Sequence, residues 1–124
     1  MVEPLALVLY EKLLPGTQLV NRLQDLKYRV ETINDPAKLV SCAMQVKPIL
    51  VFVDLEGAPV NTCSAVSTLK KNPETRHLPV IAFAREDTDE LRKSAEAAGA
   101  GLFVTESAIM HHLPQLLDQA LQID

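Results

Sequence analysis

The chain contains no tryptophan, and its aromatic residues are limited to two tyrosines and three phenylalanines. Aromatic side chains on which bases stack are typical of proteins that bind single-stranded nucleic acids, so the sequence disfavours that function. Basic residues are also in the minority, with 12 lysines and arginines against 16 aspartates and glutamates and a net charge of −4. Because nucleic-acid-binding surfaces need a basic excess, we expect no nucleic-acid partner.

Cysteines and long apolar runs are equally scarce. Cys42 and Cys63 form no CxxC motif and no cluster with histidine, which predicts two reduced, half-buried thiols in a cytosolic protein. The apolar run at residues 5–9 has no basic segment before it and meets charge at Glu11 and Lys12, unlike a signal peptide. No apolar stretch approaches the ~20 residues of a membrane-spanning helix. We expect a cytoplasmic protein with no membrane partner.

Several signatures of enzymes and metal sites are absent. The chain has no GxGxxG motif, and residues 99–101 (Gly-Ala-Gly) are typical of a turn. Residues 11–17 supply few of the hydroxyl groups and glycines that a flavin phosphate would need. His111 and His112 are adjacent and point in different directions on a helix, and His77 is distant in the sequence, so zinc binding is disfavoured. With no serine–histidine–aspartate arrangement either, we expect no enzymatic activity.

What is present is an alternation of short apolar runs with longer amphipathic segments. A chain of 124 residues that is 48% apolar and 23% charged fits a single domain, here residues 1–124. The expected strands are residues 5–10, 28–33, 49–53, 80–84 and 102–104. The expected helices carry these buried stripes: Leu19, Leu23 and Leu26; Leu39, Ala43 and Val46; Ala65, Val66 and Leu69; Leu91, Ala95 and Ala98; and Ile109, Leu113, Leu116, Leu117, Ala120 and Leu121.

Turn and capping residues mark the helix boundaries. Residues 15–17 (Pro-Gly-Thr) predict a turn before the first helix, and Asp35-Pro36 predicts an N-cap followed by the first helical position. Either Asp87 or Thr88 is expected to cap the fourth helix, which Gly99 ends. In the last helix, Pro114 predicts a break or a restart, because proline is tolerated only in a first turn.

The order βαβαβαβαβα predicts an α/β fold with a doubly wound parallel sheet of five strands, covered by helices on both faces. In such sheets, sites form at the carboxyl ends of the strands. Glu11 and Asp54 end two adjacent central strands, so we expect their carboxylates to face each other across a shallow cleft. Such oxygen ligands suit Mg²⁺, beside which a carboxylate can act as a nucleophile toward a phosphoryl group.

Four segments give the chain a resemblance to a known family: residues 47–55, 69–73, 77–83 and 97–100. Together with the order of elements, they resemble the receiver domain of bacterial two-component response regulators, from Leu5 to about Leu121. The resemblance implies the flavodoxin-like receiver fold with strand order 2-1-3-4-5. It also implies phosphorylation by a histidine kinase with Mg²⁺, on the residue that matches the family's phosphoacceptor, Asp54.

The resemblance carries over to the metal site only in part. The family has two acids after the first strand, whereas this chain has Tyr10 and Glu11. The backbone carbonyl of Glu56 matches the family's third metal contact. The resemblance therefore implies a weak Mg²⁺ site formed by Glu11, Asp54 and Glu56.

The switch positions depart further from the family. Ala84 stands where the family has a threonine or serine, and Glu106 stands where it has a lysine. Phe103 fills the aromatic switch position. We therefore interpret the chain as an atypical receiver, or pseudo-receiver, with impaired or absent phosphorylation of Asp54 that acts through protein–protein interaction. The alternative is a conventional receiver phosphorylated on Asp54.

The expected interaction face is residues 87–121, which the receiver family commonly uses for output. It would dock a histidine kinase, another signalling protein or a second copy of the chain. Exposed apolar side chains at Ile109, Met110 and Leu113 would support this docking role.

Overall fold

The computed structural model describes residues 4–10, 13–55 and 59–121. Glu11, Lys12 and Glu56 therefore lie outside the described residues. The elements are β1 (Leu5–Leu9), α1 (Leu13–Asp25), β2 (Arg29–Ile33), a 3₁₀ turn (Pro36–Lys38), α2 (Leu39–Val46), β3 (Leu50–Asp54), α3 (Pro59–Lys71), β4 (Val80–Ala84), α4 (Asp89–Ala98), β5 (Leu102–Thr105) and α5 (Glu106–Leu121).

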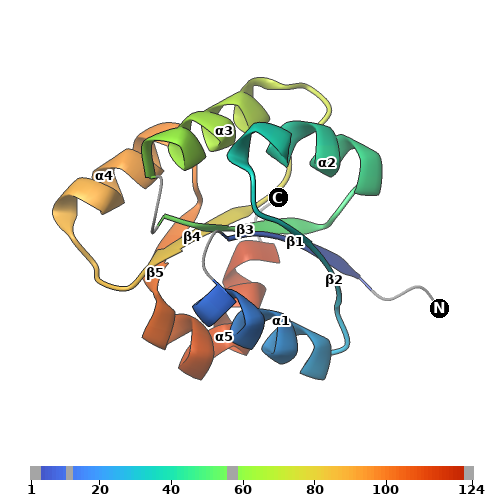
Figure 1. Cartoon of the computed structure of the whole chain (residues 1–124), viewed down its shortest axis with the longest axis vertical. Coiled ribbons are helices and arrows are strands. Elements are labelled where there is room, and N and C mark those ends of the chain that lie inside the picture. The colour runs from blue at the N-terminus through green and yellow to red at the C-terminus, as the bar shows by residue number, and fades with distance from the viewer. Residues whose placement is uncertain (1–3, 11–12, 56–58, 122–124) are drawn as a thin grey trace.

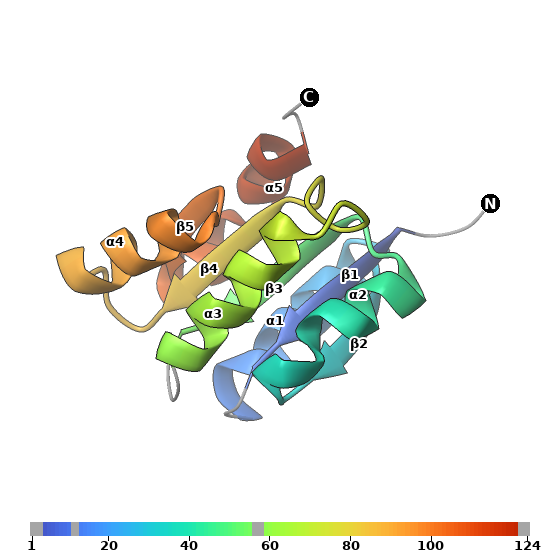
Figure 2. The ribbon, with the colours of Figure 1, turned by 90° about the horizontal axis from the view of Figure 1, so that it is seen from above.

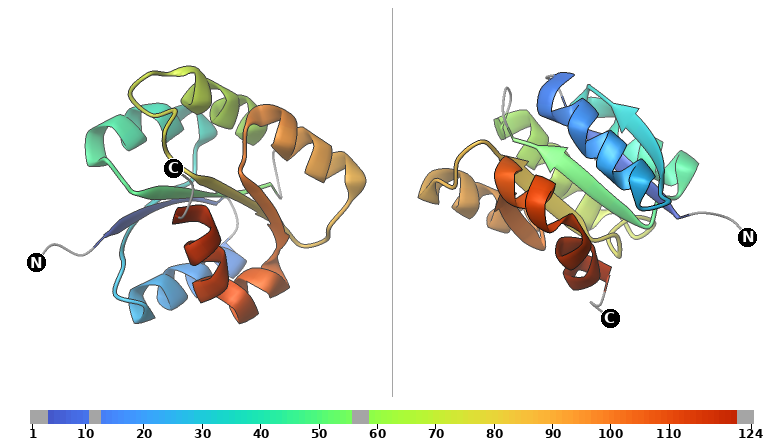
Figure 3. Two further views of the ribbon diagram at one scale, coloured as in Figure 1. Left: turned by 180° about the vertical axis from the view of Figure 1, so that it is seen from behind. Right: turned by 90° about the horizontal axis from the view of Figure 1, so that it is seen from below.

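The five strands form one parallel sheet in the order β2-β1-β3-β4-β5, as expected. Helices α2, α3 and α4 cover one face of the sheet, and α1 and α5 cover the other (Figure 1). Seen from above, the three helices of the first face lie side by side over the sheet and run along its strands (Figure 2). The views from behind and below show α1 and α5 together on the second face (Figure 3). This is the predicted doubly wound, flavodoxin-like architecture.

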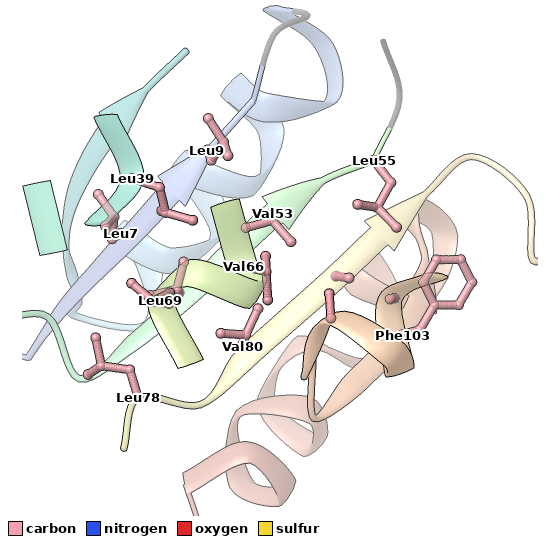
Figure 4. Packing of buried hydrophobic residues seen from close by; sticks show 14 of the residues in the cluster. Leu7, Leu9, Leu39, Val53, Leu55, Val66, Leu69, Leu78, Val80 and Phe103 are labelled. Atoms are coloured by element: carbon pink, nitrogen blue, oxygen red, sulfur yellow. The ribbon is translucent and has the colours of Figure 1, made fainter. Parts of the chain in front are cut away.

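Alternate residues of the central strand supply two separate cores. Val51 and Val53 of β3 belong to the cluster beneath α2, α3 and α4, which Figure 4 shows at close range. Leu50 and Phe52 belong to the cluster on the α1 and α5 side. Every residue of β3 is buried, which explains why its sequence is a continuous apolar run up to Asp54.

The expected caps are confirmed. Asp35 accepts a hydrogen bond from the backbone N–H of Ala37 at 3.0 Å, and Thr88 accepts one from Leu91 at 3.2 Å. Thr88 rather than Asp87 is therefore the N-cap of α4. The break in α5 is also confirmed: His112 has non-helical angles (φ −128°, ψ 25°) two residues before Pro114. Proline cannot continue the helix, so the chain restarts there.

Several local predictions were wrong. Leu121 was expected in the buried stripe of the last helix, but it is the last residue of α5 and is 41% exposed. Helix α1 begins at Leu13, so residues 15–17 lie inside the helix and not before it. Pro15 falls in the first turn, where proline is tolerated because the N–H it lacks has no intrahelical partner. Leu26 lies beyond the end of α1 and is 38% exposed, so it does not extend the buried stripe. Ile49 is also 38% exposed, because β3 begins one residue later, at Leu50.

Gly99 offers a direct test of the turn between α4 and β5. Its φ is +108°, and a Cβ placed on it would lie 2.8 Å from Cγ of Lys70. We expect Gly99→Ala to lower the free energy of unfolding by about 1–3 kcal/mol, the usual cost of such backbone strain. Urea unfolding would measure this. Gly101 is exposed and does not have a positive φ, so Gly101→Ala is the matched control and should change little; equal losses in both variants would refute the argument.

Candidate functional site

The candidate site lies at the carboxyl ends of β3, β4 and β5. Asp54 is the last residue of the central strand β3, and its side chain is buried, with only 1% exposed. The register sets Asp54 opposite Phe83 of β4, and the next N–H, that of Leu55, donates to the Phe83 carbonyl at 2.9 Å. The backbone on both sides of Asp54 is thus fixed by β4. A carboxylate at this depth is a specific feature, because charged groups are seldom buried.

Ala84 ends the neighbouring strand and is fully buried at 0% exposed. The register pairs it with Thr105, the last residue of β5. The hydroxyl oxygen of Thr105 accepts a hydrogen bond from the N–H of Ala108 at 3.1 Å, so Thr105 caps the start of α5. The sequence analysis missed this cap, although a threonine directly before a helical stripe is a usual capping signal.

Glu106 is the first residue of α5 and is partly exposed. The fold therefore brings Asp54, Ala84 and Glu106 to the same edge, at the ends of three adjacent strands. The strand-end position of Asp54 is the one that the order of elements predicted, and the roles of all three residues stay predictions. The resulting edge carries two carboxylates, and the position between them on β4 offers only a methyl group.

Phe103 lies on β5 and is 8% exposed (Figure 4). The guanidinium carbon of Arg92, on α4, lies 5.3 Å from the centre of its ring, a cation–π contact. The same guanidinium forms an ion pair with Asp87: Nε donates to Oδ1 at 3.1 Å, and Nη2 donates to Oδ2. This hydrogen bonding raises the pKa of Arg92 above its ordinary value. The sequence analysis missed these contacts.

The metal site is described only at Asp54, since its other two expected ligands, Glu11 and Glu56, lie outside the described residues. Among residues 4–10, 13–55 and 59–121, no group of three or more histidine, cysteine, aspartate or glutamate side chains is placed to hold a metal ion. The buried carboxylate of Asp54 is the kind of hard oxygen donor that Mg²⁺ prefers. Its contribution to a site is therefore compatible with Mg²⁺, and that of the other two ligands stays a prediction.

The apolar exposure that would have supported docking on the 87–121 face is absent at two of the three residues. Ile109 is 0% exposed and Leu113 is 2% exposed, while Met110 is partly buried. All three pack in the core on the α1 and α5 side of the sheet. The apolar stripe of α5 is therefore used to cover the sheet and is not available for a partner.

Both cysteines are free and half-buried, as expected. Burial raises the pKa of the Cys42 and Cys63 thiols, which disfavours the reactive thiolate. In the part of the chain that the structure describes, no helix has the length and apolar character to cross a membrane.

Comparison with solved structures matches this arrangement to receiver domains. The chemotaxis protein CheY4 of Vibrio cholerae superposes with a TM-score of 0.85 at 18% identity, covering 97% of this chain and 100% of that chain. A response regulator from Thermotoga maritima gives 0.82 at 16% identity, covering 98% and 100%. The receiver domain of the sensor histidine kinase PA1611 from Pseudomonas aeruginosa PAO1, solved with a magnesium ion in its active site cleft, gives 0.87 at 18% identity, covering 98% and 100%.

At these identities the likeness establishes the fold: the chain has the fold of a response-regulator receiver domain over almost its whole length. The resemblance inferred from the sequence is thereby confirmed at the level of architecture. No protein-family model matches the sequence, and no curated protein matches it.

Proposed function

We propose that the chain is a two-component-type signalling module in which phosphorylation of Asp54 is impaired or absent, and which acts by binding other proteins. The observation that carries the proposal is the pair of residues beside Asp54 at the strand ends. Ala84 and Glu106 stand where receivers of the resembled family have a hydroxyl group and an ammonium group. The module would be cytoplasmic and without enzymatic activity of its own.

The charge at Glu106 is the stronger of the two effects. A phosphoryl group on Asp54 would bring negative charge to an edge that already carries the Glu106 carboxylate. Two unit charges ~4 Å apart interact by roughly 4 kcal/mol at an effective dielectric constant of ~20. With glutamate this interaction is repulsive, whereas with lysine it would be attractive. The glutamate therefore disfavours the phosphorylated state twice, through the repulsion it adds and the attraction it removes.

Ala84 lacks a second group that would stabilise a phosphoryl group on Asp54. A hydroxyl group at this position would donate a hydrogen bond to a phosphoryl oxygen, and hydrogen bonds to charged groups contribute roughly 1.5–3 kcal/mol. The methyl group of Ala84 offers no donor, and because Ala84 is fully buried in β4, no water can reach that position to donate instead. A phosphoryl group on Asp54 would therefore find less stabilisation at this edge on both counts.

Under this proposal the partners are a histidine kinase or another signalling protein, and the docking face is residues 87–121, which a second copy could also use. Because Ile109 and Leu113 are buried, the contacts would be made largely by exposed polar residues of α4 and α5, such as Ser107 and His111. Mg²⁺ would bind weakly, through Asp54 with Glu11 and the Glu56 carbonyl.

The competing function is a conventional phosphoacceptor with Asp54 as the nucleophile. It is favoured by the position of Asp54 at the end of the central strand, which matches the phosphoacceptor of the resembled family. In that case a histidine kinase would supply the phosphoryl group, and Mg²⁺ would be held by the same three ligands.

A two-dimensional amide NMR titration separates the two functions. The protein is titrated with Mg²⁺ and then with beryllofluoride, a mimic of the phosphoryl group. We expect either no amide shifts with saturating Mg²⁺ and beryllofluoride, or amide shifts caused by Mg²⁺ with no further shifts when beryllofluoride is added. Shifts that centre on Asp54 and Ala84 and spread to Phe103 would instead establish a working phosphoacceptor.

A further inference from the structure

Helix α4 has little apolar surface with which to hold its position on the sheet. Its inner face consists of Leu91, Ala95 and Ala98, of which only the two alanines are buried. Alanine buries a single methyl group, so these contacts contribute less than the buried leucines of α1, Leu19 and Leu23. By contrast, α5 buries Ile109, Leu113 and two further leucines. Other contacts must therefore help to fix α4.

The contact between Arg92 and Phe103 joins α4 directly to β5. The guanidinium lies over the ring at 5.3 Å, and Phe103 is left 8% exposed. Asp87, in the segment between β4 and α4, holds the same guanidinium through two hydrogen bonds. One side chain thus connects three parts of the chain: the β4–α4 segment, α4 and β5.

We propose that Asp87, Arg92 and Phe103 form a latch that holds α4 against β5 and keeps the Phe103 ring covered. Arg92 is suited to this role because its planar guanidinium can stack on a ring while it donates along its edge to a carboxylate. A lysine ammonium group cannot make both contacts in this geometry. Asp89 and Glu96 add negative charge around Arg92, but Asp87 is the carboxylate that accepts its hydrogen bonds.

The latch is placed to open without unwinding the helix. Thr88 caps α4 through its side chain, and its carbonyl accepts the N–H of Arg92 at 3.0 Å. These bonds do not depend on the Arg92 side chain. The ion pair itself is 41% and 43% exposed at its two side chains, so salt screens it. The position of α4, and with it the surface of residues 87–121, is therefore sensitive to charge nearby.

The consequence for signalling rests on the function proposed above. If Asp54 is not phosphorylated, the Arg92 contact adds to the core packing that buries Phe103, and the 87–121 face stays in one conformation until a charged partner competes for Arg92 or Asp87. The latch itself is independent of that function, since it is a contact of the unmodified chain.

Amide hydrogen exchange on the full chain tests the latch, with Arg92→Met as the variant. Methionine keeps an unbranched side chain but provides neither the cation for Phe103 nor the donors for Asp87. We expect the α4 amides to exchange about three- to tenfold faster, from the combined loss of an exposed cation–π contact and an exposed ion pair. The exchange rates of the β3 amides should rise by no more than the same factor. The ring resonances of Phe103 should shift.

Lys93→Met is the matched control, because Lys93 is the exposed neighbour of Arg92 and the charge change is identical. It should leave α4 exchange and the Phe103 ring unchanged. Raising the salt concentration from ~0.01 to ~0.5 M should accelerate α4 exchange in the wild type but not in Arg92→Met. If Arg92→Met and Lys93→Met behave alike, the latch is refuted. A wild type that responds to beryllofluoride would overturn the proposed function and leave this result standing.

Discussion

The double variant Ala84→Thr with Glu106→Lys should accumulate phosphorylated Asp54 at least tenfold more than the wild type does. In the reaction, the Asp54 carboxylate attacks the phosphorus of acetyl phosphate in the presence of Mg²⁺, and acetate leaves. The product is measured by mass spectrometry of the intact protein. The variant restores a hydroxyl group and an ammonium group at the two strand ends beside Asp54.

The expected gain in phosphorylated Asp54 follows from the charges at this edge of the sheet. Replacing a carboxylate by an ammonium group turns a repulsion of roughly 4 kcal/mol at ~4 Å into an attraction. Because 1.4 kcal/mol corresponds to a factor of ten, even a quarter of this change is enough for a measurable gain in yield or lifetime. The threonine hydroxyl adds a hydrogen bond to a charged oxygen. We expect Glu106→Lys alone to give the larger share.

The controls for this experiment are Asp54→Asn in the double variant and each of the two single substitutions. Asp54→Asn in the background of the double variant should abolish the added mass, since the amide is not a nucleophile. Each single substitution should give an intermediate yield. A double variant that stays at the wild-type level of phosphorylation would show that Glu106 and Ala84 are not what limits the reaction. The cause would then lie in residues such as Tyr10, where the resembled family has an acid.

The path of the chain was predictable because burial on both faces leaves a clear pattern in the sequence. Apart from Asp54, β1, β3 and β4 contain only apolar residues, since their alternate residues enter two different cores. The order of strands and helices then places the carboxyl ends of the strands at one edge, which is why the positions of Asp54, Ala84 and Glu106 at that edge follow from the sequence. Proline, glycine and threonine marked most boundaries because they act through local backbone geometry.

What could not be predicted depends on distances between elements. The contact of Arg92 with Phe103 depends on how α4 is rotated over β5, and neither residue's sequence neighbours determine that rotation. Asp87 lies in an acidic run at residues 86–90, where any carboxylate favours a helix N-terminus, so the sequence does not single it out as the partner of Arg92. The exposure of Leu26 is a similar case, because it turns on where α1 ends by a single residue.

Replacing Phe52 by alanine should cause the largest loss of stability considered for this protein, about 3–5 kcal/mol. Phe52 lies at the centre of β3, pairs in register with Val8 and Ile81, and is 0% exposed. Its side chain belongs to the core between the sheet and α1 and α5. Domains of this kind are stable by roughly 5–15 kcal/mol in total, so the variant should be close to unfolding.

Urea unfolding measures the loss as a lower midpoint with an unchanged slope. Val60→Ala is the control, because Val60 is 81% exposed and its truncation should change stability by less than about 0.5 kcal/mol. Phe52→Leu should lie between the two and stay folded, which allows its amide spectrum to be compared with that of the wild type. Shifts in α1 and α5, with α2 and α3 unaffected, are expected because Phe52 contacts only one of the two cores. Equal shifts in both helical layers of Phe52→Leu would contradict the assignment of alternate β3 residues to two separate cores. They would also contradict the position that this assignment gives to Asp54 at the end of β3.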